Sequence, residues 1–261
     1  MFLTPRPTQG AIAASYDLDT GQHAVWQQER EGREVMWRKR VSRVSKLKDG
    51  GRALDVGTGF GDFIRQLRDA GGWQVEGTEV SVEAAQHARD EHGLTVHLGQ
   101  VEDVDLPKGS FDLITLWHVF EHLPYPGTTL NHLERLLKPQ GVIVIAVPND
   151  GIWPRLIQLY AKDVLKWPVI KALRRPYRPS VDAFFGKPVA GQEIHLSFFS
   201  ANRLAAAIEA RKLRVTACAV DDLYAQPNAT TDRSYRAFER VNRVTGWNFS
   251  RAMFLAAVKS G

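Results

Sequence analysis

The chain has 261 residues, of which 44% are hydrophobic and 24% are charged, and its formal net charge is +5. This composition is typical of a globular protein with one sizeable core, and no apolar run approaches the roughly 20 residues needed to cross a bilayer. A single cysteine, Cys218, excludes an intrachain disulfide framework and a zinc cluster built from cysteines.

The charge and the first residues suggest where the protein works. Residues 1–10 contain prolines and no apolar core of a signal peptide, so we expect a cytoplasmic protein. The positive charge favours an anionic partner only weakly. Because zinc-finger spacing, RNA-binding aromatic strands and a long basic tail are absent from the sequence, we expect no nucleic-acid partner.

The predicted elements alternate between strands and helices over much of the chain. A charged helix with a partial apolar stripe is predicted over residues 25–47, on the surface of a larger body. Predicted strands follow at 52–56, 74–78, 94–100, 111–118, 141–147, 214–220 and 252–259. One helix is predicted to end near Ala70, and the next to run from Ser81 to Gly93. Further helices are predicted at residues 131–137, at 203–211 after a cap at 200–202, and at 231–244.

This alternation predicts an α/β fold, a doubly wound and mostly parallel seven-stranded sheet with helices on both sides. We expect a helical N-terminal segment at 1–48 that faces the substrate or forms a lid. A Rossmann-like domain at 49–261 is expected to carry an inserted lid or substrate-recognition segment at 151–195, where the alternation stops.

A glycine-rich turn, Asp55-Val-Gly-Thr-Gly-Phe-Gly61-Asp62, joins the first predicted strand of the sheet to a helix. Glycines there allow a tight turn and a close approach to a ligand, although a turn made only for packing would look similar. The dinucleotide-binding pattern has a sixth-position glycine where this chain has Asp62, which disfavours a nicotinamide cofactor. Asp55 suits a cationic ligand, and Glu79, which ends the second strand, can accept hydrogen bonds from both ribose hydroxyls.

Four stretches, LDVGTGFG, EGTEVS, FDLITLWHVFEHLPYP and LLKPQGVIVIAVPN, resemble the class I, Rossmann-like methyltransferases that use S-adenosylmethionine. Within that class the chain looks most like the ubiquinone-biosynthesis O-methyltransferase and type-23 methyltransferase-domain branch. The resemblance is specific over residues 52–149 and weaker over residues 195–220. It implies S-adenosylmethionine as the cofactor.

The resemblance also implies a cofactor site, residue by residue. Asp55 would lie beneath the loop near the amino group of the cofactor, and Glu79 would hold the ribose hydroxyls with Val80 beside the adenine. Gln100 stands where the family usually has aspartate, and its carbonyl could still accept a hydrogen bond from the adenine. The other implied cofactor residues are Gly57, Thr58, Gly59, Gly61, Val101, Glu102, Trp117 and His118.

Histidines after the fourth strand are the candidates for catalysis. His118, Glu121 and His122 match the H-x-x-E-H pattern of a zinc-protease class, but the following prolines leave no room for the helix that this pattern needs. His118 or His122 could act as a general base, the three side chains could hold a divalent metal, or they could support the loop. We assign no metal site. His195 is a third catalytic candidate, although a histidine that stabilises a turn would look the same.

Residues 151–178 place aromatic and aliphatic side chains at helical spacing, with cations largely elsewhere on the wheel. A basic cluster ends this segment at Lys171, Arg174, Arg175 and Arg178. The favoured hypothesis is that this segment forms a lid that covers the substrate pocket. The alternative is that it makes peripheral contact with an anionic membrane.

Taken together, these features predict an S-adenosylmethionine-dependent methyltransferase that modifies a small molecule, with a hydroxyl oxygen as the favoured acceptor atom. Methyl transfer to nitrogen or carbon would use the same fold, and so would a non-catalytic module that binds the cofactor. No motif specifies the acceptor molecule or an oligomeric state.

Overall fold

The computed structural model describes residues 30–150, 195–221, 229–250 and 252–261. The strands are β1 (Gly51–Val56), β2 (Trp73–Glu79), β3 (Thr95–Leu98), β4 (Phe111–Trp117), β5 (Leu137–Pro148), β6 (Leu213–Val220) and β7 (Ala252–Lys259). The helices are α3 (Arg30–Val44), α4 (Asp62–Asp69), α5 (Val82–His92), the short 3-10 helix η1 (Phe120–His122), α6 (Pro126–Leu136), α9 (Ala201–Glu209) and α10 (Ala229–Thr245).

The strands form one seven-stranded sheet in the order β3-β2-β1-β4-β5-β7-β6. β7 pairs antiparallel with β5 and with β6, whereas the other pairs are parallel, so β6 runs parallel to β5. The predicted fold class is therefore confirmed. The carboxyl ends of β1, β2, β4, β5 and β6 meet at one edge of the sheet, the edge at which doubly wound folds bind ligands. We call it the carboxyl edge.

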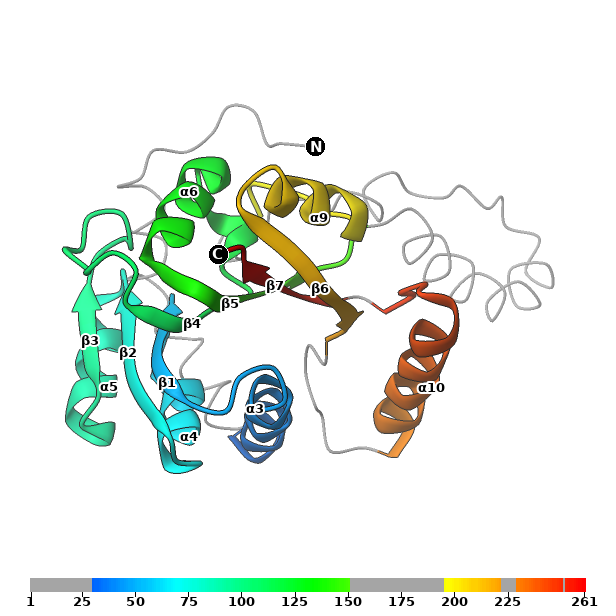
Figure 1. Cartoon of the computed structure of the whole chain (residues 1–261). Helices are drawn as coiled ribbons and strands as arrows, with labels where there is room; N and C mark the ends of the chain where they lie inside the picture. The colour runs from blue at the N-terminus through cyan, green and yellow to red at the C-terminus, as the bar shows by residue number, and fades with distance from the viewer. Residues whose placement is uncertain (1–29, 151–194, 222–228, 251) are drawn as a thin grey trace, which may run out of the picture.

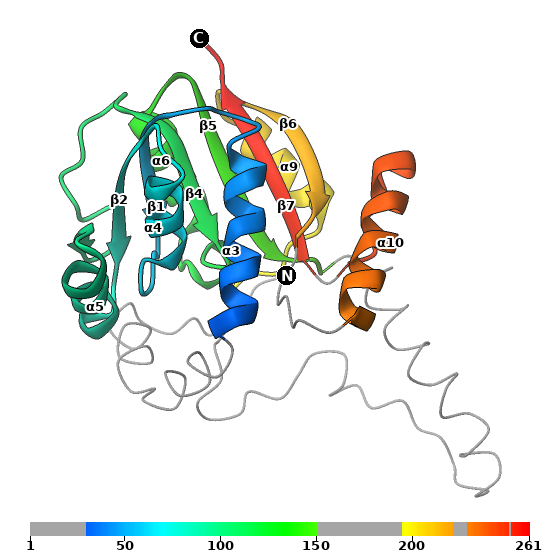
Figure 2. The same ribbon diagram turned by 90° about the horizontal axis from the view of Figure 1, so that it is seen from below.

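Helices cover both faces of this sheet: α3, α4 and α5 lie on one side and α6 and α9 on the other (Figures 1 and 2). Successive side chains of a central strand pack on opposite faces of the sheet, because side chains alternate in direction along a strand. Leu113 of β4 packs in the cluster on the side of α3 and α4, whereas Ile114 packs in the cluster that includes residues of α6 and α9. This double burial explains why the central strands are apolar throughout.

Local signals explain most helix boundaries. Ser81 caps α5 by accepting a hydrogen bond from the N–H of Ala84 at 3.3 Å, and Gly93 ends it in the left-handed conformation, as predicted. The helix predicted at 131–137 was placed wrongly. It begins at Pro126, which fits the first helical turn because proline lacks an N–H, and Leu137 already belongs to β5.

α3 is more than a surface helix. Its residues Met36, Val41 and Val44 are buried, and the two valines join the hydrophobic cluster of the sheet. α9 covers residues 201–209 and not the predicted 203–211.

Three expectations about segments and location are not tested by this structure. The division at 48/49 stays a prediction, and the lid or membrane segment at 151–194 lies outside the described residues. No helix in the described ranges has the length and apolar character needed to cross a membrane, and the cytoplasmic location stays a prediction.

Candidate functional site

The glycine loop follows β1 at the carboxyl edge. Gly57, Gly59 and Gly61 have φ values of +69°, +55° and +81°, in the left-handed region that favours glycine. A Cβ added at Gly57 would lie 2.5 Å from a methyl group of Val119, so that glycine is needed for packing. A Cβ added at Gly59 would meet no atom within 4 Å, so the loop faces open space there. The N–H groups of Gly57 and Thr58 are held by the carbonyl of Thr78.

Glu79, the last residue of β2, is hydrogen-bonded to the glycine loop. Its Oε2 accepts from the N–H of Gly59 at 2.7 Å, and its Oε1 accepts from the N–H groups of Val80 at 2.7 Å and Ser81 at 2.9 Å. Glu79 is 8% exposed. A carboxylate in this place is fixed by backbone donors and lies beside the open space at Gly59.

Asp55 lies buried under the same loop. Its Oδ1 accepts a hydrogen bond from the Thr115 hydroxyl at 2.5 Å. Burial raises the pKa of Asp55 to about 7, although hydrogen bonds from Thr115 and Thr58 work in the opposite direction. The carboxyl group therefore lacks a strong cationic partner in the described residues, which fits its expected position near the amino group of a ligand.

The turn after β3 lies next to Glu79, because the N–H of Gly99 donates to the carbonyl of Glu79 at 2.8 Å. Val101 is buried, Gln100 and Glu102 are half-buried, and Glu102 accepts a hydrogen bond from the hydroxyl of Thr129. The structure thus brings this predicted turn to the same edge as the glycine loop. The contact of these side chains with the cofactor stays a prediction.

Trp117 and His118 diverge at the end of β4. Trp117 is 6% exposed and packs in the cluster of α3 and α4, with its ring centroid 5.1 Å from that of Phe63 and 6.1 Å from that of Phe254. Its predicted contact with the cofactor stays untested. His118 adopts a left-handed backbone with φ of +56°, and its N–H donates to the carbonyl of Ala146 at 2.9 Å. This conformation is rare for a non-glycine residue and turns the chain sharply out of the sheet.

Two carboxylates face the His118 ring. Its Nε2 lies 3.3 Å from Oδ2 of Asp221, and its Nδ1 lies 3.5 Å from Oε1 of Glu121. Burial opposes the charged ring, but the hydrogen bonds to Asp221 and Glu121 outweigh it and raise the pKa of His118. Both ring nitrogens of His118 are therefore directed at carboxylates of the protein.

His122 and His195 come together beside Glu121. The N–H groups of Leu196 and Ser197 donate to the Glu121 carbonyl at 2.9 and 3.0 Å, which ties the His195 segment to η1. The ring centroids of His122 and His195 are 4.9 Å apart. One ligand atom from each of Glu121, His122 and His195 lies within 4.8 Å of the other two, so this group has the composition of a divalent metal site. The set that could hold a metal thus includes His195, whereas the sequence suggested His118.

Asp221 was missed by the sequence analysis. It directly follows β6, is 1% exposed, and accepts hydrogen bonds from the Arg40 guanidinium of α3. The usable signal was its position, since an acidic residue that directly follows a strand parallel to β5 must lie at the carboxyl edge.

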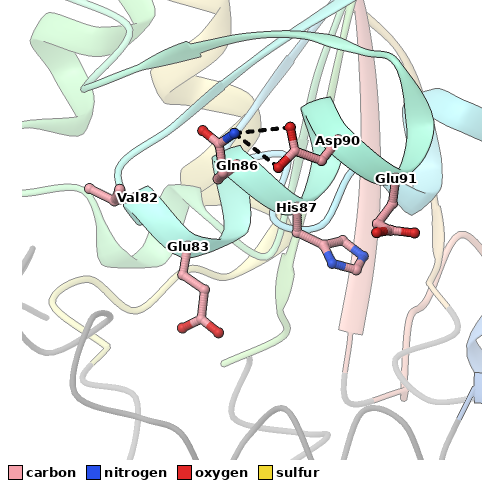
Figure 3. Close-up of a pocket in the computed structure, with 6 residues that line it drawn as sticks. All are labelled: Val82, Glu83, Gln86, His87, Asp90 and Glu91. Atoms are coloured by element: carbon pink, nitrogen blue, oxygen red, sulfur yellow. Dashed lines mark hydrogen bonds between the residues drawn. The ribbon is translucent and has the colours of Figure 1, made fainter.

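A surface hollow lies along α5 and contains none of the predicted cofactor residues (Figure 3). Its lining includes three carboxylates and Gln86, which donates to both carboxylate oxygens of Asp90 at 2.9 and 3.0 Å. Because this hollow is open and formed by one helix, the glycine loop remains the better candidate for the cofactor.

Comparison with known proteins agrees with this geometry. The family model of a methyltransferase domain matches residues 28–217. The chain belongs to this methyltransferase-domain family. A demethylmenaquinone methyltransferase of Staphylococcus saprophyticus is 30% identical over 138 residues, which cover 49% of this chain and 59% of that protein. A ubiquinone biosynthesis O-methyltransferase of Haemophilus ducreyi is 36% identical over 127 residues, which cover 44% of this chain and 53% of that protein. The chain therefore matches little more than half the length of these curated relatives.

Solved structures support the fold. An S-adenosylmethionine-dependent methyltransferase of Thermotoga maritima superposes with a TM-score of 0.59 at 16% identity, covering 95% of this chain and all of that one. The methyltransferase domain, the class I fold and the open space at Gly59 beside Glu79 agree on S-adenosylmethionine as the cofactor. Asp55 and Glu79 are the residues that would hold its amino group and its ribose.

Proposed function

We propose that this methyltransferase transfers a methyl group to a hydroxyl oxygen of a small aromatic acceptor related to quinone precursors. The names of its relatives support the acceptor class, because they act in menaquinone and ubiquinone chemistry. One observation carries the choice of oxygen: His122 and His195 lie together at the edge that also holds the glycine loop. A hydroxyl acceptor must lose a proton during methylation, and a histidine is suited to take it near neutral pH.

S-adenosylmethionine supplies an activated methyl group on a positively charged sulfur, so the protein has to position the acceptor and manage one proton. Glu79 and the loop hold the ribose side of the site, and Asp55 faces the amino group. His122 or His195 accepts the acceptor's proton. Glu121, whose pKa is lowered by His118 and His122 against the effect of burial, stays ionised, and its Oε1 lies 3.9 Å from Nε2 of His122.

The proposal is tested by methyl transfer from labelled S-adenosylmethionine to 1,2-dihydroxybenzene and to 1,2-diaminobenzene, with the product identified by mass spectrometry. We expect methylation of the dihydroxy compound. Methylation of the diamine alone would point to a nitrogen acceptor. Binding of S-adenosylhomocysteine without turnover of an acceptor panel or a cell extract would support a non-catalytic module.

Variants and metal removal then distinguish a histidine general base from a bound metal ion. We expect His122→Gln to lower kcat about a hundredfold, within the range for loss of a general base, and His132→Gln on α6 to leave it unchanged. Loss of activity on dialysis against EDTA, with recovery on addition of Mg²⁺ or Zn²⁺, would assign Glu121, His122 and His195 to a metal instead.

A further inference from the structure

A buried ion pair ties helix α3 to the end of β6. Asp221 Oδ2 accepts from Arg40 Nη2 at 2.5 Å, and Oδ1 accepts from Arg40 Nε at 3.4 Å. Both side chains are almost fully buried, at 1% and 3% exposure. The guanidinium carbon of Arg40 lies 4.7 Å from the ring centroids of both Trp37 and Trp117. Arg40 thus packs against two indole rings, and its guanidinium donates to Asp221.

Arg40 keeps Asp221 ionised. Burial favours the protonated acid, but the charge of Arg40, with the hydrogen bond and charge of His118, outweighs burial and holds the pKa of Asp221 well below its usual range. An ionised carboxylate can only accept hydrogen bonds, so Nε2 of His118, at 3.3 Å, must carry the hydrogen of that contact. The other ring nitrogen faces Glu121 at 3.5 Å. The ring orientation of His118 is therefore set from both sides.

The contact between Asp221 and His118 is important because of where His118 lies. His118 immediately follows β4 and shares the Glu121 carboxylate with His122, whose Nε2 lies 3.9 Å from the same Oε1. A change in the His118 ring would therefore move the carboxylate that supports the proton-accepting pair. Asp221 is linked to that pair through His118 and the Glu121 carboxylate that His118 and His122 share.

We propose that Asp221 is a positioning residue for methyl transfer, which orients the His118 ring at the carboxyl edge and, through Arg40, couples that orientation to the docking of α3. This inference rests on the proposed function, since it assigns Asp221 a role in that reaction. The surrounding contacts supply a built-in control. α3 has a second polar anchor, Glu34, which accepts from Arg65 at 2.5 Å and from Gln66 at 2.6 Å and does not contact His118.

The test compares Asp221→Asn, Glu34→Gln, His118→Gln and the double variant Asp221→Asn/His118→Gln in the methyl-transfer assay. We expect Asp221→Asn to lower kcat about tenfold, with less than about a threefold change in the KM of the acceptor, because misplacement of a supporting group affects the reaction more than binding. Glu34→Gln should stay within about twofold of wild type. The double variant should be no slower than His118→Gln, because the two residues act as one unit. Additive losses, or an equal loss in Glu34→Gln, would overturn the proposal.

A second measurement does not depend on turnover, and its wild-type spectrum does not depend on the folding of Asp221→Asn. Nitrogen-15 NMR of histidine-labelled wild-type protein, with His118 assigned from His118→Gln, should show a hydrogen on Nε2 at neutral pH. The His118 signals should shift in Asp221→Asn and stay in place in Glu34→Gln. A wild-type His118 without a hydrogen on Nε2 would refute the role of Asp221, whereas the expected spectrum in a protein that methylates no acceptor would refute only the proposed function.

Discussion

Replacing Asp55 by asparagine should stabilise the ligand-free protein above neutral pH. Asp55 is 2% exposed, and burial is the largest cause of its raised pKa. An amide of the same shape keeps an oxygen that can accept the hydrogen bond from Thr115 and removes the charge that burial disfavours. Asp55→Asn therefore isolates the electrostatic part of the Asp55 environment.

The size of the effect follows from the pKa in the two states. The pKa of Asp55 is 3.8 for a free side chain and about 7 in the folded protein. Because the folded state binds the proton more tightly, the wild type loses stability as pH rises from about 4, and this loss is complete above about pH 7. At about 1.4 kcal/mol for each pKa unit, the loss is at most about 4 kcal/mol. Asp55→Asn should lack it.

Urea unfolding at pH 5 and pH 8 measures this difference. We expect the free energy of unfolding of Asp55→Asn to rise relative to that of the wild type from pH 5 to pH 8. Asp55→Asn should also bind S-adenosylhomocysteine more weakly, because the amino group of the ligand loses an ionised partner. Asp112→Asn is the matched control with the opposite sign. The pKa of Asp112 is lowered because hydrogen bonds from Lys138 and the N–H of Arg52 outweigh the effect of burial, so its ionised form stabilises the fold at neutral pH. Equal pH dependence of stability in the wild type and Asp55→Asn would refute the reasoning.

Three further predictions concern backbone, capping and buried charge. Gly59→Ala should lower the free energy of unfolding by about 1–2 kcal/mol, the cost of a left-handed alanine, and calorimetry should show a marked loss of S-adenosylhomocysteine affinity. Gly57→Ala should lower the free energy of unfolding by about 1–3 kcal/mol more than Gly59→Ala, because its Cβ would collide with a neighbouring side chain. Ser81→Ala should remove about 1 kcal/mol of unfolding free energy in urea, and an unchanged midpoint would contradict the capping role. Arg40→Met should lower that free energy by up to about 3–5 kcal/mol, because the buried Asp221 would keep only His118, at 3.3 Å, and Arg43, at 3.8 Å, as charged partners; a loss under about 1 kcal/mol would show that the ion pair is not closed in solution.

The fold could be predicted largely because its central strands carry an unambiguous pattern. β5 from Gly141 onward and nearly all of β7 are apolar, as expected for strands covered on both faces. The start of α6 could not be recognised in the same way. The sequence analysis began this helix at residue 131, but Pro126 lies in its first turn, where its missing N–H costs nothing.

The cofactor half of the site follows from local sequence, whereas the other half depends on contacts between distant residues. Asp55, the glycines and Glu79 lie within 25 residues of one another, on adjacent strands whose order is set by the βαβ connection. His118 and Asp221 are 103 residues apart, and they meet because β6 joins the sheet only through β7. The hydrophobic pattern predicts that β6 is a strand, but it does not predict which residues will lie beside the end of that strand.

The same topology gives α3 a place in the chemistry of the carboxyl edge. Arg40 could have been solvated, as most arginines are, but it is enclosed by two tryptophans and neutralised by the residue that orients His118. If α3 moved away, Asp221 would lose the Arg40 cation and His118 would become its principal counter-charge. Docking of this helix brings the Arg40 charge close to His118 and opposes protonation of its ring, so a ligand that favours docking must disfavour the protonated ring.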